Sequence, residues 1–249
     1  MWSSTQVRPG VVIGFTDTTA GNLAFHVGDE PGLVAERRAA VEHALAQGVG
    51  TPPAGAMTLA YMEQVHGADV AVLDARVRAP TPTADAMVLT LELGTESGLA
   101  VMVADCVPVV LLGEAPSGKI VLAVAHAGRP GVEKGVITAV ADQMRRSGAQ
   151  SIEAWLGPSV CGRCYEVPYA MREAVAAQVP ESWSTTSAGT PGLDLPAAVL
   201  ALLAASGVKA HPSGICTLED ERYFSHRRSQ RDGVDEGRFI GFIVASAPA

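Results

Sequence analysis

The chain has 249 residues, of which 48% are hydrophobic and 18% are charged, so it can bury a large core and is not a disordered protein. Asp and Glu number 26 against 18 Lys and Arg, and the resulting formal net charge of −8 argues against a nucleic-acid-binding protein. The 6 His and 4 Cys are too few for a disulfide-stapled scaffold.

The first half of the chain contains short runs of consecutive apolar residues. Such runs predict strands that are covered on both faces, because neither face carries polar side chains. In chain order the sequence predicts a strand at Val11–Phe15, a helix at Val34–Gln47, and strands at Leu99–Ala104, Val107–Leu112 and Ile120–Ala125. Buried strands of this kind need helices on the outside of the sheet.

The second half of the chain shows helical spacing of apolar residues. It predicts helices at Val132–Ser147, Pro168–Val179 and Pro196–Ser206, with Asp194 as a cap of the last one. Ser182–Gly192 has the composition of a loop. We therefore expect one α/β domain over residues 1–249, with a sheet-rich interior and helices outside.

The sequence contains no apolar stretch as long as a membrane span, which needs about 18 residues. The first ten residues lack the charged start, apolar run and cleavage site of a signal peptide. We expect a cytoplasmic protein with no membrane partner, in which the Cys side chains are reduced thiols.

Three polar side chains follow apolar segments and are candidates for a metal site. His66 closes the segment 58–66, Cys106 follows the strand expected at Leu99–Ala104, and His126 follows the one expected at Ile120–Ala125. One thiolate and two imidazoles suit zinc, and three protein ligands leave a fourth position for water or substrate. The alternative is that each is an ordinary packed or hydrogen-bonded residue, because the spacing has no short-range signature.

Two further motifs have open interpretations. Cys161 and Cys164 form a C-x-x-C, which is a weak zinc or redox signal without a second pair, and Cys216 is the one Cys left over; packing or loop chemistry is favoured. The C-terminal run 223–228, with Arg238 further on, suits a local anion site. Nearby acidic residues make a solvated, ion-paired loop an equal alternative.

Taken together, the motifs resemble those of the YfiH family, which is also called polyphenol oxidase or laccase-domain protein and is described as a purine nucleoside phosphorylase. The motifs are Asn22-Leu23, His26-Val27-Gly28-Asp29, Gln64-Val65-His66-Gly67, Ala84-Asp85-Ala86, Ala104-Asp105-Cys106-Val107-Pro108, Ala125-His126-Ala127-Gly128, Gly157-Pro158-Ser159, Tyr165-Glu166-Val167, Cys216-Thr217, Phe224-Ser225-His226-Arg227-Arg228 and Gly237-Arg238. Their order spans about the whole chain.

The resemblance implies a layered α/β/β/α fold of the cysteine-hydrolase type. It also implies that His66, Cys106 and His126 bind one zinc ion, and that Arg38 and Gln64 contact substrate or phosphate. Three motifs depart from the family pattern. The arginine of T-x-R-x-G-G is absent at 16–21, the Asn of A-x-N-R is absent at 36–38, and H-A-G-W-R-G reads as 126–131 without its Trp and with its Arg displaced.

The leading hypothesis is a zinc-dependent enzyme that cleaves purine nucleosides with phosphate, with adenosine deamination as a second activity. Its partners are a small nucleoside and phosphate, and its oligomeric state is left open. Asp105 or Glu166 are candidates for proton transfer, and Arg38, Arg228 and Arg238 are candidates for holding phosphate.

Three alternatives belong to other classes. A copper (Cu²⁺) polyphenol oxidase of the multicopper type builds its centres from about ten His, and this chain has 6. A hydrolase would use Cys106 as nucleophile with His126 or His66 as base. A non-enzymatic protein that binds cell-division or envelope enzymes would be indifferent to loss of His66.

Overall fold

The computed structural model describes residues 3–48, 57–74, 80–92 and 95–246. One sheet has 5 strands in the order β1-β2-β13-β6-β3. These strands are β1 (Ser3–Arg8), β2 (Val11–Phe15), β13 (Phe239–Ala245), β6 (Ser97–Val103) and β3 (Leu59–Ala60). Neighbours are antiparallel except β3 and β6, which are parallel. Strand β13, from the end of the chain, therefore lies in the middle of this first sheet.

The second sheet has 6 strands in the order β12-β9-β7-β8-β5-β4. These strands are β12 (Lys209–Pro212), β9 (Ser151–Leu156), β7 (Val107–Glu114), β8 (Ile120–Ala127), β5 (Ala86–Leu91) and β4 (Val70–Leu73). The two edge strands pair in parallel and the inner strands are antiparallel. Every residue of β8 is buried, as the apolar run Ile120–Ala125 predicts, and the strand includes His126.

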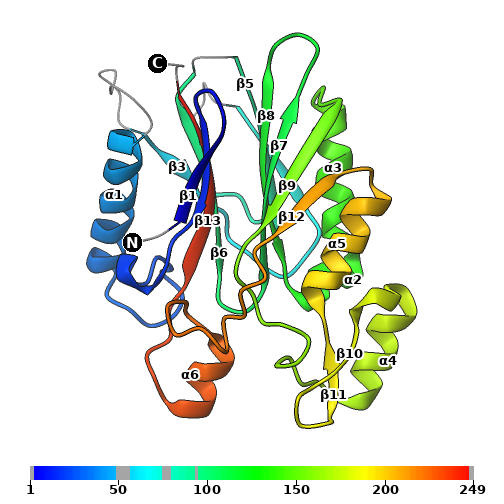
Figure 1. Cartoon of the computed structure of the whole chain (residues 1–249). Helices are drawn as coiled ribbons and strands as arrows, with labels where there is room; N and C mark the ends of the chain where they lie inside the picture. Colours follow the sequence, from blue (N-terminus) through cyan, green and yellow to red (C-terminus); the bar gives the residue numbers. More distant parts are fainter. Residues whose placement is uncertain (1–2, 49–56, 75–79, 93–94, 247–249) are drawn as a thin grey trace.

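The two sheets pack face to face and helices cover both outer faces (Figure 1). Apolar residues of both sheets, such as Ile13 and Leu122, share one core cluster. Helix α1 (Pro31–Gly48) covers the first sheet, where Val41 and Leu45 pack near Phe242. On the second sheet lie α2 (Arg129–Lys134), α3 (Val136–Arg146) and α5 (Leu195–Ala205). The expected α/β/β/α layering is therefore confirmed.

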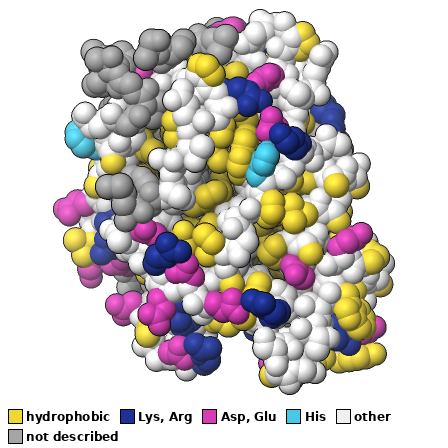
Figure 2. Space-filling view, viewed as in Figure 1, with side chains coloured by type: hydrophobic (Ala, Val, Ile, Leu, Met, Phe, Trp, Pro, Cys, Tyr) yellow, Lys and Arg dark blue, Asp and Glu magenta, His cyan; other side chains and the backbone are white. Residues whose placement is uncertain are grey.

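The remaining elements lie at one end of the sheets, opposite the β7–β8 hairpin (Figure 1). They are α4 (Tyr169–Gln178), the hairpin of β10 (Trp183–Thr185) and β11 (Pro191–Leu193), and α6 (His226–Asp232). Two short 3-10 turns complete the elements, at Thr18–Ala20 and Pro180–Ser182. Figure 2 shows the face of the molecule that is turned to the viewer in Figure 1. Apolar side chains run along the middle of this face, between the two sheets, and charged side chains lie mostly around them.

Two expectations about elements need correction, and one segment with no expected element forms a helix. The helix expected at Val132–Ser147 is divided into α2 and α3, because Gly135 has φ +86° and its left-handed backbone ends α2. The loop expected at Ser182–Gly192 contains the short β10–β11 hairpin. Residues 226–232 form α6, whose start is capped by the Ser225 side chain.

Candidate metal centre and active site

The side chains of His66, Cys106 and His126 converge, and their ligand atoms all lie within 4.8 Å of one another. The His66 Nε2 atom is 3.8 Å from the Cys106 Sγ atom. The His66 and His126 rings meet edge to face with centroids 4.6 Å apart. The structure thus brings together the three residues that the sequence singled out.

The three residues lie on one strand and two loops. His126 lies near the end of β8, as expected, but the strand before His66 is only Leu59–Ala60, so His66 lies in the loop that leads to β4. Cys106 lies in the short connection from β6 in the first sheet to β7 in the second. Asp105 in that connection has φ +81° and His66 has φ +56°, a left-handed conformation that is uncommon for residues with a side chain.

Asp85 is the residue that holds this arrangement, and sequence reasoning assigned it no role. Its carboxylate is fully buried and lies 2.8 Å from His126 Nδ1. It also accepts the backbone N–H groups of Val65 (3.2 Å), His66 (2.9 Å) and Gly67 (2.5 Å). A carboxylate that orients a ligating His in this way is the usual outer partner of a metal site. The signal in the sequence was a lone acidic residue at the start of an apolar strand.

The electrostatics of the site favour a thiolate on Cys106 and an imidazolium on His126. Burial alone would raise the pKa of Cys106, but the charges and hydrogen bonds of His126 and His66 outweigh it and lower that pKa to about 6. Burial alone would lower the pKa of His126, but Cys106 and Asp85 outweigh it and raise that pKa to about 9. The site therefore favours a deprotonated sulfur, which is the form that binds metal or acts as nucleophile.

These donors fit a zinc ion. One sulfur and two imidazole nitrogens are typical zinc ligands, and the Asp85–His126 contact supplies the outer shell. Gly128 leaves the space open: a Cβ atom there would lie 2.7 Å from His66 Cδ2 and 3.1 Å from Cys106 Sγ. The absence of a side chain at this glycine is what allows the ligands to approach one another.

Asp105, expected as a proton-transfer residue, has both carboxylate oxygens engaged. Thr217 donates its hydroxyl to Oδ1 at 2.6 Å, and the backbone N–H of Arg227 donates to Oδ2 at 2.8 Å. These bonds hold the strained backbone next to Cys106 and tie it to the segment that leads into α6. The geometry favours a positioning role for Asp105.

Gln64 and Arg38 both contact Met102, near the end of β6. The Gln64 amide makes two hydrogen bonds to the Met102 backbone, at 2.7 Å and 2.9 Å. Arg38 donates to the Leu23 carbonyl at 2.8 Å and to the Met102 sulfur at 3.2 Å. Its guanidinium lies over the rings of Tyr61 (3.7 Å) and Phe25 (4.4 Å). Arg38 is thus a positive charge clamped between two aromatic rings.

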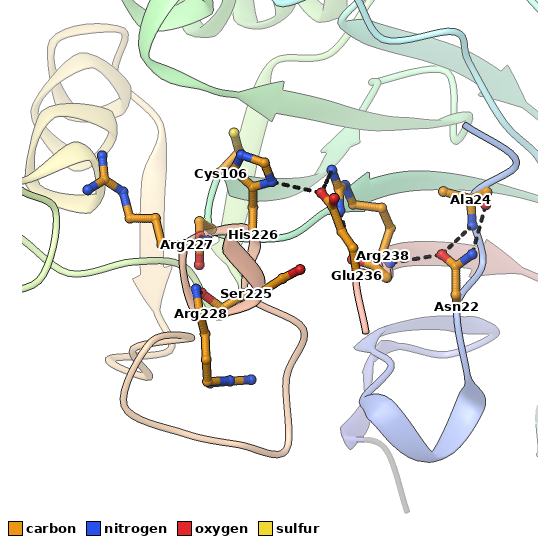
Figure 3. A network of polar contacts seen from close by, with 12 residues as sticks. Asn22, Ala24, Cys106, Ser225, His226, Arg227, Arg228, Glu236 and Arg238 are labelled. Carbon is orange, nitrogen blue, oxygen red and sulfur yellow. Dashed lines mark hydrogen bonds and ion pairs between the residues drawn. The ribbon is translucent and has the colours of Figure 1, made fainter. Parts of the chain in front are cut away.

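Arg228 and Arg238, expected to hold phosphate, differ in their contacts. Arg228 donates to the carbonyl oxygens of Thr217 (2.7 Å) and Tyr223, and in Figure 3 its guanidinium points away from Cys106. Arg238 pairs at 2.8 Å with Glu236, which also lies 2.7 Å from His226 Nδ1 (Figure 3). The contacts of Arg228 favour a structural role, whereas Arg238 belongs to a charged network.

Arg238 also acts electrostatically on His26. Desolvation and the charge of Arg238 lower the pKa of His26, and Arg38 and His126 add smaller effects in the same direction. His26 therefore lies within electrostatic range of all three residues.

Two other arginines act electrostatically on Tyr165, and both lie in segments that the sequence analysis had marked. The guanidinium of Arg227 lies 4.3 Å from the centre of the Tyr165 ring. Burial raises the pKa of Tyr165, Cys106 adds to that rise, and the charges of Arg227 and Arg129 oppose it. Arg129 also pairs with Glu133 one turn along α2. Arg129 is the arginine displaced in the family motif, and its charge acts on Tyr165.

The family model described as multi-copper polyphenol oxidoreductase laccase matches residues 5–246. The chain belongs to this family. A relative called a purine nucleoside phosphorylase in Streptomyces coelicolor is 44% identical over 94% of this chain and 95% of its own length. A Neisseria meningitidis crystal structure is 27% identical, covers 99% of both chains and has a TM-score of 0.78.

The resemblance to YfiH is confirmed in the fold as well. The crystal structure of Bacillus licheniformis YfiH is 23% identical and covers 98% of this chain and 99% of its own, with a TM-score of 0.77. Multicopper centres need many imidazole ligands. This chain has 6 His, which is too few for a conventional multicopper oxidase. Among the described residues, no helix has both the length and the apolar character to cross a membrane.

Proposed function

We propose that this protein is a zinc-dependent purine nucleoside phosphorylase. The observation that carries the proposal is the convergence of His66, Cys106 and His126 around a donor set that fits zinc. The Streptomyces coelicolor relative, which bears this activity in its name, matches nearly the full length of the chain. Adenosine, inosine and methylthioadenosine are the proposed substrates.

In the proposed reaction the bond between C1′ of ribose and N9 of the purine breaks, and a phosphate oxygen forms the new bond to C1′. The base leaves with the electron pair and takes up a proton. A zinc ion bound at the centre supplies Lewis-acid polarisation. Asp85 fixes the ring of His126, and Asp105 fixes the backbone beside Cys106.

Phosphate needs positive charge in a protein whose net charge is −8. We propose Arg38 and Arg238 for this task, because the charges of both act on His26, as the charge of His126 does. Arg227 and Arg129 are further candidates, because the charges of both act on Tyr165. Gln64 would act indirectly, by holding the Met102 backbone that Arg38 also contacts.

The test is product identification with purified, zinc-loaded protein. Adenosine or inosine is incubated with and without phosphate, and the products are separated by chromatography. We expect free base and ribose 1-phosphate only when phosphate is present, and loss of both in Cys106→Ala and His126→Ala. His43→Ala is the matched control, because His43 is an exposed histidine on α1. Absence of phosphate-dependent cleavage by the zinc-loaded protein would overturn the proposal.

The same experiment reads out adenosine deamination, because inosine formed from adenosine without phosphate indicates hydrolysis at C6. Oxygen uptake by copper-loaded protein with a phenol would indicate the oxidase chemistry in the family's description. Either result without phosphorolysis would replace the proposal with that activity.

One structural observation favours a second candidate. The Asp85 carboxylate lies 2.8 Å from His126 Nδ1, and the ligand atoms of His126 and Cys106 lie within 4.8 Å of each other. This is the order of an orienting acid, a base and a nucleophile in a cysteine hydrolase. The test measures nucleoside cleavage after chelation and after alkylation of Cys106. Cleavage that persists after chelation and is lost on alkylation would support the hydrolase and refute the zinc proposal.

A further inference from the structure

A second cluster of potential ligands lies apart from the three residues of the first centre. It consists of Cys161, Cys164, Cys216 and Glu219, whose ligand atoms all lie within 4.8 Å of one another. The three Cys side chains are free thiols. Cys216 is buried, Cys161 and Cys164 are half-buried, and Glu219 is exposed. The cluster therefore reaches the surface, where an ion from solvent can enter.

The chain builds this cluster from two turns of the same kind. The Cys161 carbonyl accepts the N–H groups of Cys164 and Tyr165, each at 2.9 Å. The Cys216 carbonyl accepts the N–H groups of Glu219 at 3.2 Å and of Asp220 at 2.9 Å. Each turn thus presents two ligands separated by two residues. A C-x-x-C that faces a second pair of ligands at this spacing resembles a structural zinc site, with Glu219 in the place that Cys or His usually takes.

The two turns are held against each other before any ion binds. Ser159 donates its N–H to Ile215 at 3.2 Å, and its carbonyl accepts the N–H of Thr217 at 3.1 Å. This short parallel bridge fixes Cys216 beside the segment that leads into Cys161. A C-x-x-C zinc site needs a second pair of ligands, and the fold brings Cys216 and Glu219 to that position.

The polar contacts of the cluster suit a metal–thiolate group. The backbone N–H of Cys161 points at the Cys216 sulfur at 3.4 Å, which stabilises a thiolate. The Cys164 sulfur lies 3.4 Å from a Glu219 carboxylate oxygen. Arg163 pairs with the same carboxylate at 3.4 Å and offsets part of the negative charge that would remain around a divalent cation. Apolar packing does not explain why an exposed carboxylate meets three thiols.

We propose that Cys161, Cys164, Cys216 and Glu219 bind a thiophilic divalent cation of the zinc class as a structural site. Three sulfurs and one oxygen fill all four tetrahedral positions, so no position is left for a substrate. Soft thiolate ligands select such an ion over magnesium or calcium. This site is separate from the centre at His66, Cys106 and His126, and the proposal does not depend on which reaction that centre catalyses.

The proposed ion would stabilise the segment beside Cys106. Thr217, next to Cys216 in the chain, donates to the Asp105 carboxylate at 2.6 Å. Val160, next to Cys161, donates its N–H to the Asp105 carbonyl at 3.0 Å. Both turns of the second site are therefore bonded directly to the residue that precedes Cys106. The ion would act as a positioning element for the first centre.

The experiment is a metal-binding measurement on the full chain, prepared under reducing conditions and stripped by a chelator. Zn²⁺ is added in competition with a chromophoric chelator, and bound metal is counted by elemental analysis after dialysis. We expect the wild type to bind one Zn²⁺ more per chain than Cys161→Ser/Cys164→Ser. Cys106→Ser is the matched control, because it removes a thiol from the first centre and leaves the second intact.

Co²⁺ in place of Zn²⁺ identifies the ligands directly. We expect Cys106→Ser to retain an intense thiolate-to-cobalt absorption band and tetrahedral d–d bands, because three thiolates remain at the second site. Cys161→Ser/Cys164→Ser should lose most of that band. Glu219→Gln keeps all the thiols and is the milder variant in case the double variant does not fold. We expect it to weaken Zn²⁺ binding at this site by at least about 10-fold, the effect typical of losing even an outer-shell partner.

Three results would overturn the proposal. One is equal Zn²⁺ stoichiometry in the wild type and in the folded Cys161→Ser/Cys164→Ser variant. Another is a cobalt spectrum of Cys106→Ser without thiolate bands. The third is a disulfide among these Cys that persists in reduced protein. Since none of these readouts uses catalysis, failure here is distinguishable from failure of the phosphorylase proposal.

Discussion

Replacement of Asp85 by Asn tests whether this carboxylate organises the first centre. Oδ1 accepts the His66 N–H and faces His126 Nδ1, while Oδ2 accepts the N–H groups of Val65 and Gly67. An Asn side chain has one oxygen, so whichever way it turns, its NH₂ group points at one or more backbone N–H donors. At least one buried donor loses its acceptor.

The loss of stability follows from the number of N–H donors left without an acceptor. An unsatisfied buried donor costs about 1–3 kcal/mol, and we expect Asp85→Asn to lower the free energy of unfolding by that amount. For a chain of this size each kcal/mol lowers the Tm by about 2–4 °C, so the Tm should fall by about 2–12 °C. The loss of the outer partner of His126 should also weaken Zn²⁺ binding at this centre by about 10- to 100-fold.

The assay is thermal unfolding of chelator-treated protein, followed by Zn²⁺ competition titration. Asp69→Asn is the matched control, because Asp69 lies on the loop that carries His66 and has an exposed side chain. The control should match the wild type in Tm and in Zn²⁺ affinity. If Asp85→Asn also matches it in both, the reasoning about the buried carboxylate is refuted.

Three further outcomes are expected. In chelator-treated protein the rate of Cys106 alkylation should rise as the pH increases through about 6, because the thiolate is the reactive form. His126→Asn should move that rise to higher pH, because it removes the cation that stabilises the thiolate. Alkylation is followed by mass spectrometry, and an unchanged pH profile in the variant would contradict this prediction. Gly128→Ala should abolish Zn²⁺ binding at the first centre with little change in Tm, whereas Gly32→Ala, whose Cβ would meet no described atom within 4 Å, should bind normally. Arg228→Ala should lower the Tm and leave the KM for phosphate unchanged, because its guanidinium serves backbone carbonyls; a raised KM with an unchanged Tm would show that it holds phosphate.

The strands of the core were readable from the sequence because of where they lie. A strand buried between a second sheet and a helix layer has no solvent-facing side, so β7 and β8 are apolar at nearly every position. The division at Gly135 was not readable in the same way, since the apolar spacing of Val132–Ser147 continues across the break. Only the backbone shows that the glycine is left-handed there.

The candidate sites depended on contacts between distant segments. His66, Cys106 and His126 were named from their positions after apolar runs, but their convergence is a property of the fold. Asp85 was overlooked because a single carboxylate before a strand resembles any turn residue. Cys216 was left without a partner because it lies far from Cys161 in the chain, and the parallel bridge that joins their segments has no local sequence signal.

The first centre lies on a seam of the molecule. His66 is on the segment that passes from β3 in the first sheet to β4 in the second, and Cys106 is on the segment that passes from β6 to β7. The three side chains therefore meet only after the two sheets have docked, so an ion at this centre would bind late in folding. An ion bound there would link the two sheets. The free energy of its binding would add to the stability of the folded state.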